Sequence, residues 1–305
     1  GGVRQNEIGA EAVFNPGVLA VDFIDGAVAA RDAGVAHEFM HGGHADVRGV
    51  ARFGTLEAER EAGAAHQAVG VVEAVVRTVG QDEVVGIDNF SYGSMDNLKF
   101  DDHDFGGEVR KMDIRDKAGM LALFEAEKFD VVYNIAGIAP LPDCQSDPVQ
   151  AIEVNTLGLV NLLEAGRRTG IRQLVQASTN AMYENETEFP TVESKFNPPT
   201  LIYPNTKYCG ERFAQSFADT YGMTVTCLRF ANVYGPHIDC LRKQPPFVGY
   251  MIRELYYDRT PEFHSDGNQR RDYIYVDDLI ALALRVVERL SLIHISEPTR
   301  RSYIS

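Results

Sequence analysis

The chain has 305 residues, of which 45% are hydrophobic, enough to form the core of one large domain or two modest ones. Its formal net charge of −15 argues against a nucleic-acid partner, because phosphate contacts need a basic face. No apolar run approaches the roughly 20 residues of a membrane-spanning helix, and no signal peptide is visible, so we expect no membrane partner.

The first 70 residues are rich in Ala, Gly, Val, Asp, Arg and His and show little periodic pattern. One constellation in them, His37-Glu-Phe-Met-His41, is a pattern in which two imidazoles on one helix face can bind zinc. Gly34 weakens the helix that this pattern needs, and His44 does not match the third-ligand spacings of zinc peptidases. The four cysteines show neither metal-binding nor redox spacing and are expected to be reduced thiols in a cytoplasmic protein. We therefore expect no metal site and keep a zinc metallopeptidase as a distant alternative.

From residue 84 onward, short apolar runs alternate with helical patterns. Strands are expected over 84–88, 109–112, 130–136, 172–178 and 224–229, and helices over 116–128, 147–169, 203–221, 246–257 and 276–290. This alternation predicts an α/β fold, a doubly wound parallel sheet of the Rossmann type. It ends near residue 230, which predicts a small C-terminal substrate lobe. In the helix over 203–221, we expect Phe213, Phe217 and Tyr221 to form the buried face.

Tyr203 and Lys207 lie four residues apart on that helix, so their side chains project from one face. A Tyr phenol with a pKa near ~10 is a poor base at neutral pH, but a cation within about 4–6 Å lowers that pKa. Lys207 can be this cation, which makes Tyr203 a candidate proton acceptor or donor. Thr179 ends a predicted strand, and a hydroxyl there points into the crevice where open α/β sheets bind ligands. The sequence therefore predicts that these three side chains converge on one substrate oxygen.

Four motifs in a fixed order carry a resemblance to a known family. They are Ser178-Thr-Asn-Ala-Met-Tyr183, Tyr203-Pro-Asn-Thr-Lys207, Arg229-Phe-Ala-Asn-Val-Tyr-Gly-Pro236 and Asp266-Gly-Asn-Gln-Arg-Arg-Asp-Tyr-Ile-Tyr-Val-Asp-Asp278. Over roughly residues 84–290, the chain resembles the extended short-chain dehydrogenase/reductase family, specifically the NAD-dependent nucleotide-sugar epimerases and dehydratases of the UDP-glucose 4-epimerase type. The motifs are highly specific for the family and only weakly specific for the substrate.

The resemblance implies NAD as the cofactor. Asp88 ends the first legible strand, where a carboxylate accepts hydrogen bonds from the adenosine ribose and repels a 2′-phosphate, which favours NAD over NADP. The cofactor-binding residues implied are Gly70, Asp88, Asn89, Asp113, Ile114, Ile135, Ala136, Gly137, Asn155, Tyr203 and Lys207. Asp113 is expected to face the adenine amino group, and Lys207 to hold the nicotinamide ribose. A solvated polar position on a helix is an equally good interpretation of Asn155.

The resemblance also implies a nucleotide-sugar substrate, bound by Thr179, Asn180, Asn232 and Arg271. Asn232 and Arg271 are expected at the diphosphate, where a planar guanidinium can donate two hydrogen bonds to phosphate oxygens. Dehydratases of this type carry Asp-Glu after the Thr, whereas Asn180 and Ala181 here cannot act as the acid or base of water loss. We therefore expect epimerisation of a UDP-hexose at C4 through a 4-keto intermediate. A 4-reductase, dehydratase or decarboxylase of the same family is the alternative.

The resemblance is incomplete at both ends of the chain. A Gly-x-x-Gly-x-x-Gly turn should precede Asp88 by about 20 residues, because its glycines let the backbone approach the cofactor pyrophosphate. In Gly63-Ala-Ala-His-Gln-Ala-Val-Gly70, only Gly70 occupies a fingerprint position. We hypothesise that residues 1 to about 70 are not native coding sequence and that 291–305 are a foreign tail resembling translated adapter sequence.

The expected organisation follows from these observations. It comprises an unassigned segment over 1–70, an NAD-binding domain over 71–230, a truncated substrate lobe over 231–290 and the tail over 291–305. An inactive fragment of such an enzyme is a further alternative, since the phosphate turn and the lobe look damaged. By analogy with the family alone, a homodimer could form.

Overall fold

The computed structural model describes residues 18–22, 84–91, 95, 108–187, 191, 197–235, 238, 240, 242, 244–263, 267 and 270–296. Gly70 and the histidines His37, His41 and His44 lie outside the described residues. The expectations about a phosphate-binding turn and a zinc site therefore stay predictions.

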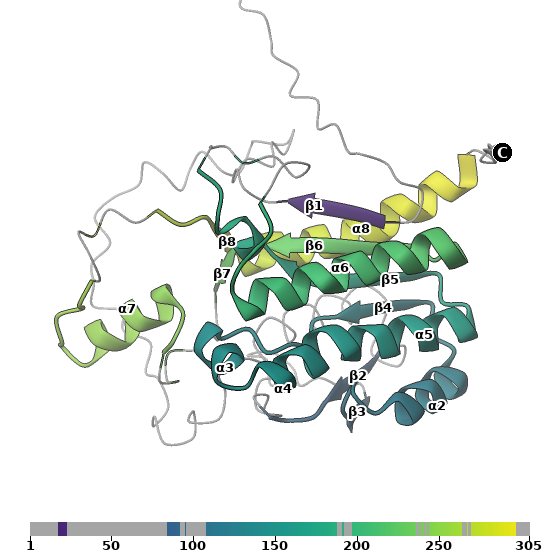
Figure 1. The fold of residues 1–305 in the computed structure, drawn as a ribbon, viewed down its shortest axis with the longest axis horizontal. Helices are drawn as coiled ribbons and strands as arrows, with labels where there is room; N and C mark the ends of the chain where they lie inside the picture. The colour runs from purple at the N-terminus through teal and green to yellow at the C-terminus, as the bar shows by residue number, and fades with distance from the viewer. Residues whose placement is uncertain are drawn as a thin grey trace, which may run out of the picture.

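The largest sheet has four parallel strands in the order β1-β6-β5-β4 (Figure 1). Its strands are β1 (Val18–Asp22), β4 (Val131–Asn134), β5 (Gln173–Thr179) and β6 (Val225–Phe230). β5 and β6 are buried along their whole lengths, as parallel strands covered on both faces should be. The sequence predicts β4, β5 and β6 closely, whereas β1 lies in the segment for which it predicts no strand.

Two short parallel pairs accompany this sheet. β2 (Val85–Asp88) pairs with β3 (Glu108–Lys111), and β7 (Asn232–Tyr234) pairs with β8 (Tyr273–Tyr275). In the described part of the chain, neither pair shares a strand ladder with the four-stranded sheet. The predicted α/β class with parallel strands is confirmed, but the described strands form three parallel sheets rather than one continuous sheet.

Helices cover both faces of the four-stranded sheet (Figure 1). On one face lie α2 (Lys117–Glu127), α5 (Leu159–Thr169) and α6 (Ile202–Tyr221), and on the other lies α8 (Val276–Ser296). α3 (Leu141–Ser146) and α4 (Pro148–Ile152) precede α5, and α7 (Phe247–Tyr256) lies apart from the sheet. All the predicted helices are present, and α8 continues past its predicted end at residue 290.

The helix predicted over 147–169 is one continuous run with a wider turn in its middle. Its start is capped by Asp147, whose Oδ1 accepts a hydrogen bond from the backbone N–H of Gln150 at 3.0 Å. It ends at Gly170, whose φ of 76° lies in the left-handed region that glycine favours. Between them, η3 (Glu153–Gly158) is a π-helix that carries the buried Asn155. Such π turns are frequent at functional sites.

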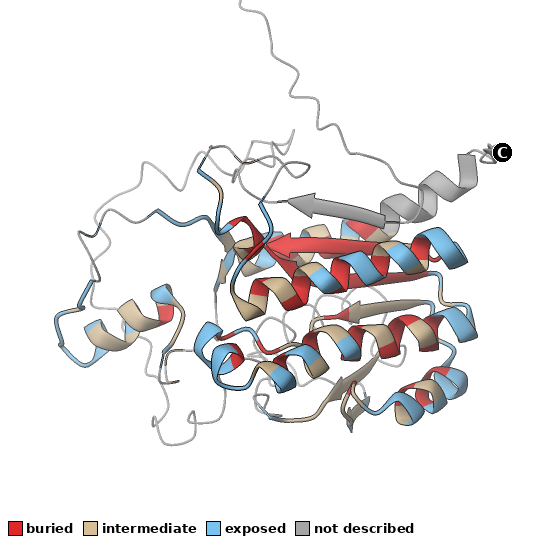
Figure 2. Ribbon diagram, in the orientation of Figure 1, coloured by how far each residue is buried: buried red, intermediate tan, exposed pale blue. Residues whose placement is uncertain are grey.

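Two apolar cores flank the sheet, and the red interior of Figure 2 shows them between the layers. The core under α2, α5 and α6 includes Leu159, Leu163, Leu174, Ala214 and Val225. The core under α8 includes Val175, Leu228, Leu279 and Ala283. Neighbouring residues of β5 therefore enter opposite cores, because successive side chains of a strand point to opposite faces.

The buried face of α6 differs from the predicted one. Phe213 and Tyr221 are 46% and 53% exposed, and Phe217 is only partly buried. The face against the sheet instead carries small or polar residues, namely Pro204, Thr206, Lys207, Gly210, Glu211, Ala214 and Ala218. The prediction is wrong because small side chains let α6 approach the sheet closely, and its two buried charged groups find polar partners there.

Candidate active site

The C-terminal ends of β4, β5 and β6 lie at one edge of the sheet, because the three strands are parallel. Thr179 ends β5 at this edge, and the loop after β4 lies beside the first turn of α6. There Ile138, Cys144 and Ala151 form a small apolar cluster, against which Tyr203 packs. The edge where open α/β sheets bind ligands thus carries the predicted catalytic side chains.

The Thr179 hydroxyl lies beside the Tyr203 phenol, close enough to favour its ionised form. The Thr179 hydroxyl oxygen accepts a hydrogen bond from the backbone N–H of Ala181 at 3.1 Å, at the start of the 3₁₀ turn η4 (Asn180–Tyr183). Burial raises the pKa of Tyr203 to about 12, and the nearby Thr179 hydroxyl only partly offsets this rise. The predicted lowering of this pKa by Lys207 stays a prediction.

Lys207 is buried, and its Nζ donates a hydrogen bond to the carbonyl of Ala177 on β5 at 2.9 Å. Burial lowers the pKa of Lys207 to about 8, against smaller opposing effects of Cys144, Cys227 and Glu211. At neutral pH the side chain is thus still a cation, one helical turn from Tyr203.

Asn155 forms hydrogen bonds that join the loop after β4 to α6, the helix that carries Tyr203 and Lys207. Its Oδ1 accepts from the backbone N–H of Ile138 at 2.7 Å, and its Nδ2 donates to the Ile138 carbonyl at 2.9 Å and to Thr206 Oγ1 at 3.0 Å. Asn155 is 2% exposed, so its interpretation as a solvated polar residue is wrong. Its binding of a cofactor stays a prediction, and Thr206 is a partner that the sequence analysis missed.

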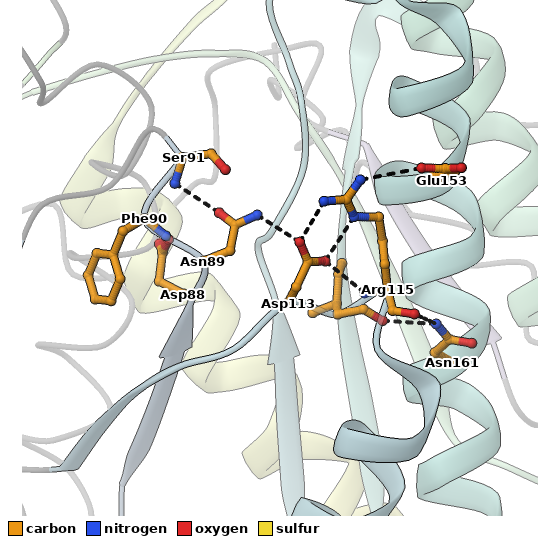
Figure 3. A network of polar contacts seen from close by, with 9 residues as sticks. Asp88, Asn89, Phe90, Ser91, Asp113, Arg115, Glu153 and Asn161 are labelled. Carbon is orange, nitrogen blue, oxygen red and sulfur yellow. Dashed lines mark hydrogen bonds and ion pairs between the residues drawn. The ribbon is translucent and has the colours of Figure 1, made fainter.

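A second polar cluster follows β2 and β3, and Figure 3 shows it at close range. Asp88 Oδ1 accepts from the backbone N–H of Phe90 at 2.6 Å, in a turn where Phe90 has a φ of 57°. Asn89 Oδ1 accepts from the backbone N–H of Ser91 at 2.9 Å, and Asn89 Nδ2 donates to Asp113 Oδ2 at 3.1 Å. The structure thus brings together Asp88, Asn89 and Asp113, the three polar residues predicted at the adenosine.

The Asp113 carboxylate accepts four hydrogen bonds. Arg115 donates three of them, from its backbone N–H and Nε to Oδ1 at 2.9 and 3.0 Å and from Nη2 to Oδ2 at 2.8 Å. With the fourth, from Asn89, they hold the pKa of Asp113 well below its usual range. A carboxylate offers about four lone-pair sites, so an adenine amino group would have to replace one of these donors. The sequence analysis missed Arg115, for which the Asp-Ile-Arg spacing was the available signal.

Arg115 also connects this cluster to the helix that carries Asn155 (Figure 3). Its Nη1 donates to Glu153 Oε2 at 3.3 Å, and Glu153 begins the π-helix η3. Nearby, Asn161 Nδ2 donates to the carbonyl of Ile114 at 2.9 Å, while the Ile114 side chain belongs to the first core. The π-helix η3 therefore joins two groups of residues. Glu153 contacts Arg115 in the polar cluster around Asp113, and Asn155 contacts Thr206, which precedes Lys207 on α6.

Asn232 and Arg271, the residues predicted at the diphosphate, lie near one another at the β7–β8 pair, Asn232 at the start of β7 and Arg271 two residues before β8. Asn232 Nδ2 donates to the carbonyl of Asp272 at 2.9 Å, which places it beside the residue that follows Arg271. Both side chains are exposed, and Arg271 Nη1 donates to the Arg270 carbonyl at 2.7 Å. Their contact with a diphosphate stays a prediction.

The remaining predicted residues lie at the edge of the four-stranded sheet where β4 and β5 end. Asn180 directly follows Thr179, and Ile135 and Ala136 lead from β4 to Gly137. Among the described residues, no group of three or more His, Cys, Asp or Glu side chains is arranged to hold a metal ion. Within the same residues, no helix combines the length and the apolar character needed to cross a membrane.

The sequence matches the model of the NAD dependent epimerase/dehydratase family over residues 71–296, a range that contains both polar clusters and all four motifs. The chain belongs to this family. The resemblance predicted from the motifs is thereby confirmed.

Curated relatives include both epimerases and dehydratases. The UDP-glucose 4-epimerase of Mycolicibacterium smegmatis is 31% identical over 205 residues, which cover 66% of this chain and 64% of that protein. The dTDP-D-glucose 4,6-dehydratase of Mus musculus is 28% identical over 228 residues, which cover 74% of this chain and 63% of that protein. The chain thus spans slightly less than two thirds of the length of these relatives.

Solved structures confirm the Rossmann-type architecture. The UDP-glucose 4-epimerase of Thermotoga maritima, solved with UDP-glucose, superimposes with a TM-score of 0.69 at 28% identity, covering 74% of this chain and 71% of that one. The UDP-glucose 4-epimerase of Thermus thermophilus, solved with NAD, gives a TM-score of 0.62 at 28% identity, covering 73% and 71%.

Proposed function

We propose that this chain catalyses the NAD-dependent epimerisation of a nucleotide sugar, a UDP-hexose at C4, through a 4-keto intermediate. The observation that carries the proposal is the placement of Thr179 beside the buried phenol of Tyr203 at the ligand-binding edge of the sheet, with the buried cation Lys207 one turn along α6. Similarity to UDP-glucose 4-epimerases supports the choice of substrate.

The described residues fit a dinucleotide at both of its ends. Asp88, Asn89 and Asp113 would hold the adenosine, and the acidic Asp88 favours NAD over NADP. Gly137 and Lys207 would hold the nicotinamide ribose: a Cβ at Gly137 would lie 3.1 Å from Lys207 Nζ, so glycine keeps this space open. When bound, NAD would supply reversible hydride transfer at the sugar C4, by which the carbon is oxidised and then reduced from its other face.

Tyr203 is the group that moves the proton in this proposal. A phenol with a pKa of about 12 is protonated at neutral pH, so accepting the proton of the sugar O4 requires that pKa to fall. The ammonium group of Lys207 lies on the same face of α6 and is a cation that can lower it. The Thr179 hydroxyl would hydrogen-bond the substrate oxygen and so place O4 against Tyr203. The phenol then returns the proton to the inverted sugar.

A 4-reductase, dehydratase or decarboxylase is the second candidate, and the similarity to the mouse dehydratase supports keeping it. Against water loss stand Asn180 and Ala181, which follow Thr179 and cannot act as acid or base. We therefore place epimerisation first. An inactive fragment of the enzyme is the alternative to both.

A homodimer is part of the proposal. Large apolar side chains are exposed on adjacent helices, namely Val149, Ile152 and Leu157 along the α4–η3 run and Phe213 on α6. Pairing of these helices with those of a second copy would cover them. Sedimentation of the purified chain at two concentrations tests this, and a monomer throughout would contradict it.

Incubation with NAD and either UDP-glucose or UDP-galactose, followed by anion-exchange separation, tests the proposed reaction. We expect each sugar to yield the other. A 4-keto-6-deoxy product would favour the dehydratase instead, and no conversion by a chain with bound NAD would identify an inactive fragment.

A further inference from the structure

A buried ion pair lies behind the catalytic side chains. Glu211 and Arg229 are 7% and 6% exposed, and Arg229 donates from Nη2 to Glu211 Oε2 at 2.7 Å and from Nε to Oε1 at 3.0 Å. Glu211 lies on α6, one turn after Lys207, and Arg229 lies near the C-terminal end of β6. Because a buried charge without its partner is strongly unfavourable, this pair holds α6 against β6.

The same pair contacts both chain segments that flank Thr179. Ser178 precedes Thr179 on β5, and its hydroxyl donates to Glu211 Oε1 at 2.5 Å. Tyr183 ends the 3₁₀ turn that follows Thr179, and its hydroxyl accepts a hydrogen bond from Arg229 Nη1. Both side chains are buried. Thr179 is thus held from both sides by residues that bind one ion pair.

We propose that Glu211 is a positioning residue that fixes the Thr179 hydroxyl against the Tyr203 phenol. Thr179 comes from β5 and Tyr203 from α6, and the bond between Ser178 and Glu211 joins the same two elements within the buried layer. The inference rests on the proposed function, since the placement of these hydroxyls affects turnover only if they act on substrate. Displacements on the scale of an ångström are costly in catalysis, which gives such a link a measurable effect.

Glu211 has an electrostatic effect on the same site. Three titratable groups raise the pKa of Lys207 against the lowering caused by burial: Cys144 from α3, Cys227 from β6 and Glu211 from α6 itself. Of these three groups, Glu211 is the carboxylate and the other two are thiols. Removing its charge should lower the pKa of Lys207 below about 8. This effect can be measured without any turnover.

The first test compares Ser178→Ala with Thr226→Val. Each removes one buried side-chain hydrogen bond of the sheet, but Thr226 accepts its bond from Gln173 Nε2 at 3.0 Å, near the opposite ends of β5 and β6. We expect kcat for UDP-glucose to fall about 10- to 100-fold in Ser178→Ala, with KM within about twofold of wild type. Thr226→Val should lose stability and keep its kcat. Equal kcat values in the two variants would overturn the positioning role.

The second test titrates Lys207 by NMR in protein labelled with ¹³C-lysine, with Lys207→Arg identifying its signal. We expect a pKa of about 8 in the wild type and a lower value in Glu211→Gln. If Glu211→Gln does not fold, the comparison of Ser178→Ala with Thr226→Val still tests the positioning role, because neither variant leaves a buried charge unpaired. An unchanged pKa of Lys207 overturns the role of Glu211, whereas an inactive wild type with the expected pKa shift contradicts only the proposed function.

Discussion

The two ends of the proposed cofactor site are built differently. At the catalytic end, β5 and β6 are buried along their whole lengths between α6 and α8. At the adenosine end, β2 is only partly buried, both terminal residues of β3 are exposed, and in the described part of the chain the pair shares no strand ladder with the larger sheet. Two strands on their own are marginally stable, so this end depends on the packing of Ile87 against the core under α2, α5 and α6 and on polar bonds such as that from Arg115 to Glu153.

We infer from this difference that chemistry and cofactor affinity are set by separate parts of the fold. The catalytic side chains are placed by apolar packing and by buried bonds such as that from Lys207 to the Ala177 carbonyl. The adenosine residues are placed by hydrogen bonds in partly exposed turns, where such bonds stabilise less. Changes at one end are therefore expected to affect turnover, and changes at the other to affect binding of NAD.

Replacing Tyr203 by Phe gives the largest expected effect and acts on the catalytic end alone. Loss of the phenol should lower kcat about 10²- to 10⁴-fold, the usual contribution of a general acid–base group, with NAD affinity unchanged. Steady-state kinetics and NAD titration measure both quantities. Tyr221→Phe is the matched control, because Tyr221 ends the same helix and is exposed. Near-normal turnover in Tyr203→Phe would refute the assignment of the proton-transfer group.

Amide hydrogen exchange compares the two ends directly in the unmodified chain. We expect amides of β2 and β3 to exchange about 100-fold faster than those of β5 and β6, because local opening costs less where few apolar contacts are broken. Added NAD should slow exchange in β2 and β3 most. Equal protection of the two strand pairs would contradict a less stable adenosine end.

Replacing Lys207 by Met should inactivate the protein while stabilising it. The pKa of Lys207 falls from 10.5 to about 8 on folding, so its charged form is disfavoured in the fold by about 3 kcal/mol. Allowing for the lost bond to Ala177, we expect a gain of about 1–3 kcal/mol in unfolding free energy at pH 7. Urea unfolding measures it, with the exposed Lys117→Met on α2 as the control.

The pH dependence of the stability gained in Lys207→Met follows from the direction in which folding shifts the pKa of Lys207. Below pH 8 Lys207 is protonated in both the folded and unfolded states, so the full penalty applies. Between about pH 8 and 10.5 only the unfolded state holds the proton, so wild-type stability rises with pH and the advantage of Lys207→Met shrinks. An advantage independent of pH would contradict the buried, protonated lysine.

Replacing Asp88 by Asn gives the smallest expected effect and acts on the adenosine end. The amide oxygen can still accept from the backbone N–H of Phe90, so the turn is kept while the charge that repels a 2′-phosphate is lost. We expect the preference for NAD over NADP to fall about tenfold, or about 1.4 kcal/mol, with kcat at saturating NAD unchanged. Binding titrations measure it, with Asp116→Asn at the cap of α2 as the control.

Local signals made much of the fold predictable. Apolar runs with turn residues at their ends indicated β4, β5 and β6, and Asp147 and Gly170 marked the ends of one helix. The buried face of α6 was not predictable from hydrophobicity, because it is defined by how closely small residues let the helix approach the sheet. β1 has no such local pattern, and its position depends on pairing with β6, which lies about 200 residues later.

In the candidate site, too, local sequence patterns were predictive, whereas effects of packing were not. The spacing of Tyr203 and Lys207 and the strand that ends at Thr179 were sufficient to predict that these groups lie at one edge of the sheet. The raised pKa of Tyr203 was not predictable, because desolvation depends on what packs around the phenol. Arg115 was missed although its spacing from Asp113 was a local signal, whereas Glu211 was missed because its partners Ser178 and Arg229 come from other elements.

Measurement of NAD bound by the purified chain tests the central claim most directly. The protein is denatured, and the supernatant is run on an anion-exchange column beside a sample that was first incubated with added NAD. We expect about one NAD per chain in the incubated sample, because both ends of the site carry residues that fit the cofactor. No NAD in either sample would contradict the claim that this chain assembles a cofactor site around Tyr203 and Lys207.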